Sequence, residues 1–142
     1  MIVTCEANTG LKVPEAYLDS RAGYTRKVEF DLTVARDYVV YAVAVRRGLV
    51  WYYLSGDLHP FYPVAYPAPL FSIADNRLSR CWVLTYTPNH PDHELLIAFE
   101  EWCANRHFYD RLTDMDEMER AIFAKYKALI DSEHVVGREP PA

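Results

Sequence analysis

Two adjacent apolar runs near the middle of the chain constrain its fold more than any other feature. The first covers residues 38–45 and the second residues 49–54, and β-branched and aromatic side chains are frequent in both. Residues 46–48 between them end in a glycine, which supplies the positive φ that a tight turn needs. The pattern predicts an antiparallel hairpin with strands at 38–46 and 49–54. Because both faces of the hairpin are apolar, we expect other elements to cover each face.

The segment before the hairpin alternates strictly between apolar and polar residues. Val28, Phe30, Leu32 and Val34 fall on one side of the chain, which predicts a half-buried strand at residues 26–34. This strand would precede the hairpin in a meander. Further strands are expected at residues 1–5, 70–73 and 80–87.

The last third of the chain predicts two helices. Asp92 is a suitable N-cap for the first helix, and Thr113 or Asp114 for the second. Acidic residues begin the second helix and lysines lie near its end, which is the order that the helix dipole favours. The apolar stripe of the first helix comprises Leu95, Leu96, Phe99, Trp102 and Cys103.

Strands followed by helices are typical of an α+β domain. We predict an antiparallel β-meander sheet of about five strands, with two C-terminal helices packed on one face. A chain of 142 residues is most simply one domain, here residues 1–132, followed by a flexible tail at residues 133–142.

Composition narrows the classes of function. The net charge of −5 argues against nucleic acid as a partner, because phosphate binding needs clustered Lys and Arg. The longest apolar run has eight residues, well short of the roughly 20 that cross a bilayer, so no membrane partner is expected. The absence of a signal-peptide pattern and the three cysteines suit a cytoplasmic protein with reduced thiols. No phosphate-binding loop, dinucleotide fingerprint or EF-hand pattern occurs, so no cofactor is expected.

A zinc site is one candidate for chemistry, because His90, His93, Cys103 and His107 are the ligand types that zinc prefers. We favour the alternative in which Cys103 is a buried apolar residue and the first two histidines belong to a polar loop. Ser55, Asp57 and His59 are a second candidate, for nucleophilic catalysis. Their crowding within five residues is more typical of a turn, since triad members usually come from separate elements. No catalytic residue is assigned.

An aromatic surface is the most informative functional feature. The loop at residues 55–69 holds four prolines, and loops this long in a compact domain are often functional. Tyr and Trp dominate binding hot spots, and arginines frequently border them. The candidate partner-binding residues are Trp51, Tyr53, Phe61, Tyr62 and Tyr66, with Arg46 and Arg47 at the rim.

These features favour a small cytoplasmic module that binds a protein partner. One concrete version is an immunity-type or antitoxin-like protein that blocks a toxin. The alternatives are a small hydrolase or zinc enzyme that uses His90, His93, Cys103 and His107, and a structural protein that associates with itself through its aromatic face.

Overall fold

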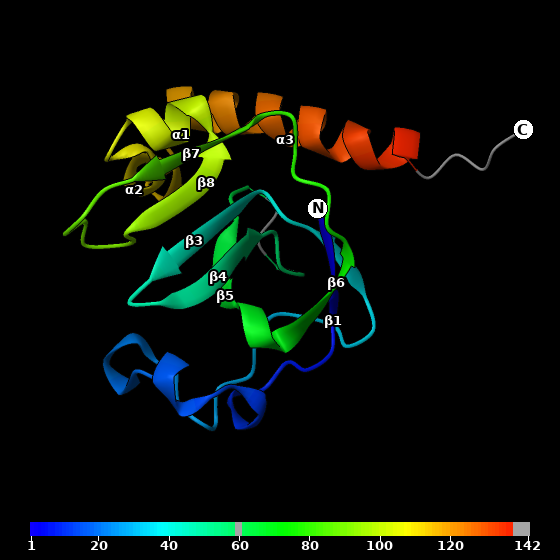
Figure 1. Ribbon diagram of the computed structural model, residues 1–142, viewed down its shortest axis with the longest axis vertical. Coiled ribbons are helices and arrows are strands. Elements are labelled where there is room, and N and C mark those ends of the chain that lie inside the picture. The colour runs from blue at the N-terminus through cyan, green and yellow to red at the C-terminus, as the bar shows by residue number, and fades with distance from the viewer. Residues whose placement is uncertain (59–60, 138–142) are drawn as a thin grey trace, which may run out of the picture.

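The computed structural model consists of strands in two sheets and a layer of C-terminal helices (Figure 1). It describes residues 1–58 and 61–137, with the backbone alone for residues 135–137. The strands are β1 (Ile2–Cys5), β2 (Asp37–Val39), β3 (Ala42–Arg46), β4 (Leu49–Leu54), β5 (Val64–Pro67), β6 (Phe71–Asp75), β7 (Trp82–Tyr86) and β8 (Leu95–Phe99). The helices are α1 (Glu100–Ala104), α2 (Phe108–Thr113) and α3 (Glu117–Gly137). Short 3-10 helices occupy Gly10–Lys12, Glu15–Tyr17, Ser20–Ala22 and Ala68–Leu70.

The strands form a five-stranded sheet of order β5-β4-β3-β8-β7 and a three-stranded sheet of order β2-β1-β6. All neighbouring strands are antiparallel. The predicted α+β class is confirmed, and the helices lie on one side of the larger sheet. The single meander is replaced by two sheets, because the chain leaves β4 and β5 to build β6 beside β1 before it returns as β7 and β8.

The hairpin predicted from the two apolar runs is present as β3 and β4. Its register runs from Ala42 opposite Tyr53 to Arg46 opposite Leu49, and Arg47 and Gly48 have positive φ values of 54° and 76° in the turn. The first apolar run is divided between the sheets, because Tyr38 pairs with β1 rather than continuing β3.

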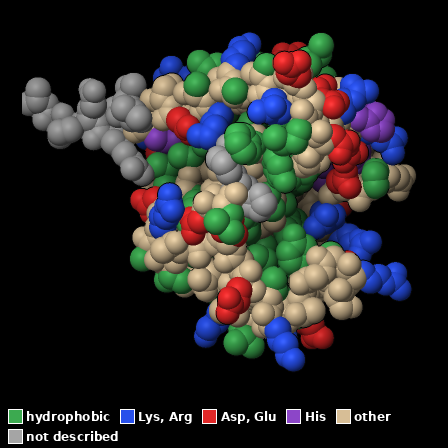
Figure 2. All heavy atoms as spheres, turned by 180° about the vertical axis from the view of Figure 1, so that it is seen from behind, with side chains coloured by type: hydrophobic (Ala, Val, Ile, Leu, Met, Phe, Trp, Pro, Cys, Tyr) green, Lys and Arg blue, Asp and Glu red, His purple; other side chains and the backbone are tan. Residues whose placement is uncertain are grey.

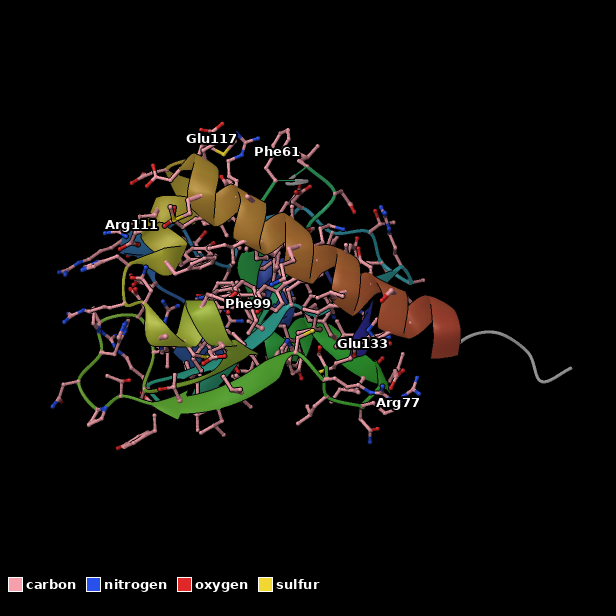
Figure 3. All side chains as sticks on the ribbon, turned by 90° about the horizontal axis from the view of Figure 1, so that it is seen from above. Phe61, Arg77, Phe99, Arg111, Glu117 and Glu133 are labelled. Carbon is pink, nitrogen blue, oxygen red and sulfur yellow. The ribbon has the colours of Figure 1, made fainter. Side chains whose placement is uncertain are left out.

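One hydrophobic core lies between the helices and the larger sheet. Small side chains on the sheet, Ala42, Ala44 and Ala98, allow the helices to approach closely, and Phe99 and Phe108 fill the space between them. Figure 3 shows Phe99 beneath α3 in the interior. Side-chain hydrogen bonds hold α3 in place: the Tyr41 hydroxyl donates to Asp131 (2.6 Å), the Tyr126 hydroxyl to Glu101 (2.9 Å) and the Ser79 hydroxyl to Glu133 (2.6 Å).

A second core lies between the larger sheet, the smaller sheet and the N-terminal lobe, which we define as residues 8–34. It holds Tyr52, Leu54 and Tyr66 from the hairpin and β5, packed with Val3 and Leu70. The smaller sheet and the lobe thus cover the hairpin face that lies opposite the helices. Part of the proline-rich loop at residues 55–69 is the edge strand β5, where the lack of a proline N–H is tolerated.

The strand predicted at residues 26–34 is wrong. Phe30 and Leu32 do point inward, but the backbone is held by turns and by bonds to the preceding segment, such as Phe30 N to Asn8 O at 2.8 Å. Val34, which the alternation places on the buried side, is exposed instead. The alternation therefore reflects the burial of Phe30 and Leu32 in the second core, and the described residues of this segment form no strand.

The first predicted helix is also wrong over most of its length. Residues 95–99 form the strand β8 between β3 and β7, and only the following five residues are helical. The additional helix α2 lies between α1 and the last helix, in a segment for which the sequence pattern predicts no helix. The last helix is confirmed but continues to Gly137, past the predicted start of the tail at residue 133. Residues 138–142 of that predicted tail lie outside the described residues.

Candidate functional site

A cleft of about 1060 Å³ lies on the helix-bearing face of the larger sheet, between the N-terminal lobe on one side and α1 and α2 on the other. The strand register places Tyr53 and Trp51 on this face, because they pair with Ala42 and Ala44, which lie beneath the helices. Arg46 follows Ala44 by two residues in β3 and so lies on the same face. Figure 2 shows hydrophobic side chains in a hollow between the two halves of the molecule, with Lys and Arg side chains gathered at one end. We call this site the aromatic cleft. Its rings are Tyr17, Tyr24, Trp51, Tyr53, Trp102 and Tyr109.

The lobe side of the aromatic cleft is fixed by Tyr17. Its hydroxyl donates to the carbonyl of Val50 (3.1 Å) and accepts from the amide of the same residue (3.2 Å). Strand β5 ends at Pro67, opposite Trp51, so no residue of β5 pairs with Val50. The Tyr17 hydroxyl takes the place of that strand and bonds to both backbone groups of Val50. Tyr17 and Tyr24 pack against Trp51 with ring centroids 5.3 and 5.8 Å away. The lobe is therefore anchored to the sheet at the cleft.

The helix side is a cluster of three rings. Trp102 stacks on Tyr109 at 5.6 Å, and Tyr53 meets both rings edge-on. The Tyr109 hydroxyl donates to the carbonyl of Pro63 (2.8 Å). Burial raises the pKa of Tyr53 to about 12 and raises that of Tyr109 as well. Both hydroxyls are therefore neutral at physiological pH and act here as packing and hydrogen-bonding groups.

Arginines give the aromatic cleft its charge. The Arg46 guanidinium lies over the Trp51 ring, 4.6 Å from the centroid, in cation–π geometry. Within the described residues, no carboxylate lies within 4.0 Å of the side chains of Arg21, Arg46, Arg47 or Arg106, which all line the cleft. Their charges are thus available to a ligand. Three acids also line the site: Asp19, Asp92 and Asp110.

Glu94 holds the hairpin turn that carries two of these arginines. Its carboxylate accepts from the backbone amides of Arg47 and Gly48, each at 2.9 Å. These hydrogen bonds lower the pKa of Glu94. Because the carboxylate is engaged by backbone, the turn is tied to the start of β8 and the Arg47 side chain keeps its charge free.

Two buried ring nitrogens at the aromatic cleft have no hydrogen-bond partner in the described part of the chain: Trp51 Nε1 and His93 Nδ1. Trp51 is only 4% exposed. Leaving a buried donor unpaired costs about 1–3 kcal/mol, so most such groups have a partner in the working state of a protein. Trp51 thus carries a donor without a described partner in the floor of the cleft, with the Arg46 guanidinium over its ring.

His90 and His93 are the other polar feature. Their rings stack with centroids 4.1 Å apart, and His90 Nδ1 accepts from the amide of Asp92 (3.1 Å). Burial lowers the pKa of His93, and the neighbouring His90 and Arg46 lower it further, against the opposing charge of Asp92. His93 is therefore neutral at pH 7.

This shift predicts an acid-sensitive contribution to stability. The unfolded chain takes up a proton on His93 near pH 6.5, whereas the folded protein does so only at lower pH, so the folded state loses stability as the pH falls below about 6.5. We expect His93→Gln to lose less unfolding free energy than the natural protein between pH 7.5 and 5, as measured by urea denaturation. An equal loss in both proteins would contradict the shift.

The four zinc candidates are only partly brought together. His90, His93 and Cys103 line the aromatic cleft, but His107 is exposed at the start of α2 and does not. The Cys103 thiol donates to the carbonyl of Ala98 (3.5 Å), and burial raises its pKa, which disfavours the thiolate that zinc needs. Among the described residues, no three His, Cys, Asp or Glu side chains are grouped so that they could hold a metal ion.

Asp57 has a structural role that the sequence did not indicate. Its carboxylate accepts from Thr33 (2.7 Å), Tyr38 (2.8 Å) and Arg36 (2.9 Å). Burial alone would raise its pKa, but these three donors outweigh that effect and lower it. Asp57 thus joins the lobe to the loop after β4. His59, its neighbour in the suggested catalytic group, lies outside the described residues.

The predicted partner-binding residues divide between two places. Four of them, Arg46, Arg47, Trp51 and Tyr53, line the aromatic cleft. The other three do not. Tyr66 is buried against Phe30, Tyr62 is half-buried, and Phe61 is 58% exposed beside the start of α3, as Figure 3 shows.

Sequence reasoning missed the rings that complete the two walls: Tyr17, Tyr24, Trp102 and Tyr109. Tyr17 and Tyr24 come from a segment with weak helical or strand periodicity. The apolar stripe places Trp102 in the core, and the structure shows that its ring packs in the core and also lines the cleft. The number of tyrosines, 11 in 142 residues, was the one available signal.

Comparison with protein-family models, with curated proteins and with solved structures finds no match to this chain. Each helix within the described residues is too short or too polar to cross a membrane. The function is therefore argued from the geometry of the aromatic cleft.

Proposed function

We propose that this protein is a binding module that holds a segment of a partner protein in the aromatic cleft. The observation that carries the proposal is the stack of Arg46 on Trp51, whose buried Nε1 lacks a partner in the described residues, between two walls of rings. Trp, Tyr and Arg are the residue types that contribute most to binding hot spots. Rings fixed on both sides, by the Val50 and Pro63 backbone, lose little entropy on binding.

The charges describe the segment that would fit. Four arginines without a carboxylate partner in the described residues favour a segment with acidic side chains. A carboxylate there would reach Arg46 and Arg47, while an apolar neighbour packs on the rings. The acids Asp19, Asp92 and Asp110 and the net charge of −5 disfavour a continuous phosphate chain, which supports protein over nucleic acid.

The narrower version, an immunity-type or antitoxin-like role, rests on the small size and acidity of the chain. A cleft bordered by arginines suits an acidic loop of such a partner better than a basic active site. The enzyme alternative has less support, because Cys103 bonds to backbone and His107 lies apart from His90 and His93.

The decisive experiment compares two variants in which a single arginine is replaced by glutamate. Immobilised protein captures its partner from cells of the source organism, and calorimetry then measures the affinity of the purified partner for each variant. We expect Arg46→Glu to weaken binding at least tenfold, which is about 1.4 kcal/mol, because it reverses the charge over Trp51.

Arg120→Glu is the matched control, since Arg120 lies on α3 over the exposed ring of Phe61, outside the aromatic cleft. It should leave the affinity unchanged. Binding that is lost in Arg120→Glu and kept in Arg46→Glu would move the site to the Phe61 loop and refute the cleft.

A further inference from the structure

Strand β7 is an unusual edge strand. In the described part of the chain, four strands lie at sheet edges: β2, β5, β6 and β7. Natural edge strands carry charges or prolines that prevent pairing with other chains. Three of the four fit this rule, with Asp37 in β2, Pro67 in β5 and Asp75 in β6. The fourth, Trp-Val-Leu-Thr-Tyr at residues 82–86, has neither a charge nor a proline.

The sheet face beside this edge is apolar and open. Leu84 and Tyr86 are 61% and 66% exposed. In the strand register Leu84 lies next to Ile97 of β8, and Tyr86 lies next to Leu95, which in turn adjoins Val45 of β3. These residues share the face opposite the helices and belong to neither hydrophobic core. Figure 3 shows β7 as the green strand along the lower boundary of the molecule.

We propose that β7 pairs antiparallel with β7 of a second copy of this chain, so that the two five-stranded sheets form one continuous sheet across a two-fold axis. A two-fold interface uses the same surface on both partners, and an uncharged strand can meet itself without repulsion. In a pairing centred on Leu84, Arg80 lies opposite Pro88 of the other copy, at the start of the loop after β7. That loop carries Asp92 and Glu94 and no lysine or arginine, so each Arg80 approaches an acidic segment of the other copy.

A second copy is favoured over a foreign strand for two reasons. The symmetric match of charge arises from this chain alone, and Leu84, the middle residue of β7, would lie near its own counterpart at the axis. The exposed Leu84 and Tyr86 of both copies would then adjoin on one face and shield each other from water. The loop after β7 also lines one end of the aromatic cleft, but the strand pairing uses none of the rings or arginines proposed to bind a partner there, so each proposal has its own test.

Sedimentation of the full chain tests the proposal. Over about 1 to 500 µM, a range that contains the micromolar dissociation constant expected for a small interface, the mass should rise from 16.5 kDa towards twice that value. Leu84→Lys should raise the dissociation constant at least tenfold, because two lysines would face each other at the axis. Amide hydrogen exchange at Leu84 and Tyr86 should slow at high concentration in the natural protein alone.

Leu11→Lys is the matched control, since Leu11 is 68% exposed in the N-terminal lobe and lies in a 3-10 helix outside both sheets. It should self-associate like the natural protein. A mass of 16.5 kDa at every concentration, or equal association of Leu84→Lys and the natural protein, would overturn the proposal.

Discussion

Phe99→Ala is expected to lower the free energy of unfolding by about 3–5 kcal/mol, the cost of removing a fully buried ring and leaving a cavity. Phe99 stacks on Tyr126 with centroids 4.3 Å apart and meets Phe108 edge-on at 5.3 Å. It also ends β8 and precedes α1, so its ring is held where sheet and helices join. Urea denaturation followed by circular dichroism measures the change.

Met118→Ala is the control for this variant. Met118 is 71% exposed near the start of α3, so its truncation should change the unfolding free energy by less than about 0.5 kcal/mol. If Phe99→Ala cost no more than Met118→Ala, the helices would not pack on the sheet through this ring.

Gly10→Ala is expected to lower the unfolding free energy by about 3 kcal/mol through overpacking. A Cβ atom at Gly10 would collide with the backbone carbonyl of Thr25 and come within 2.9 Å of a Val28 methyl group. Backbone cannot move aside as a flexible side chain can, and the Gly10 amide is itself bonded to the Val28 carbonyl at 2.9 Å. The lobe would have to open. Urea denaturation again measures the loss.

Gly48→Ala separates this collision from the general cost of replacing a glycine. Gly48 has nothing within 4 Å of the added Cβ, but its φ of 76° disfavours alanine by about 1 kcal/mol. Equal losses in the two variants would show that the lobe does not pack against Gly10 as described.

The elements that could be predicted are those in which one physical effect decides. The hairpin is one, because a long apolar run, a short break with a glycine and a second apolar run leave few alternatives. The long C-terminal helix is another, since its periodicity continues for several turns. Strand β7 was also expected, within two residues at its start.

Residues 95–99 show why the rest was not predictable. Leu-Leu-Ile-Ala-Phe suits the first turn of a helix as well as a central strand, and the apolar stripe continues into Trp102 in either case. What selects the strand is distant: β3 and β7 each offer a partner edge. No local pattern carries that information, and the helix assignment was wrong for this reason.

The candidate site was predictable on one side only. Trp51, Tyr53, Arg46 and Arg47 belong to the hairpin, so their closeness followed from a correctly predicted element. The opposite walls come from the lobe and from the junction of β8 with α1, where the sequence interpretation failed. A cleft between three elements requires the tertiary arrangement of all three.

The order of strands in the larger sheet also bears on how the chain folds. Val45 of β3 pairs with Leu95 of β8, fifty positions later, at the centre of the sheet. The hairpin and the helical segment can each form from local contacts, but joining them requires the long intervening chain to be ordered, and such closure is slow. We therefore expect the two halves of the sheet to form early and to join late, so that the floor of the cleft is completed only after both of its halves have formed.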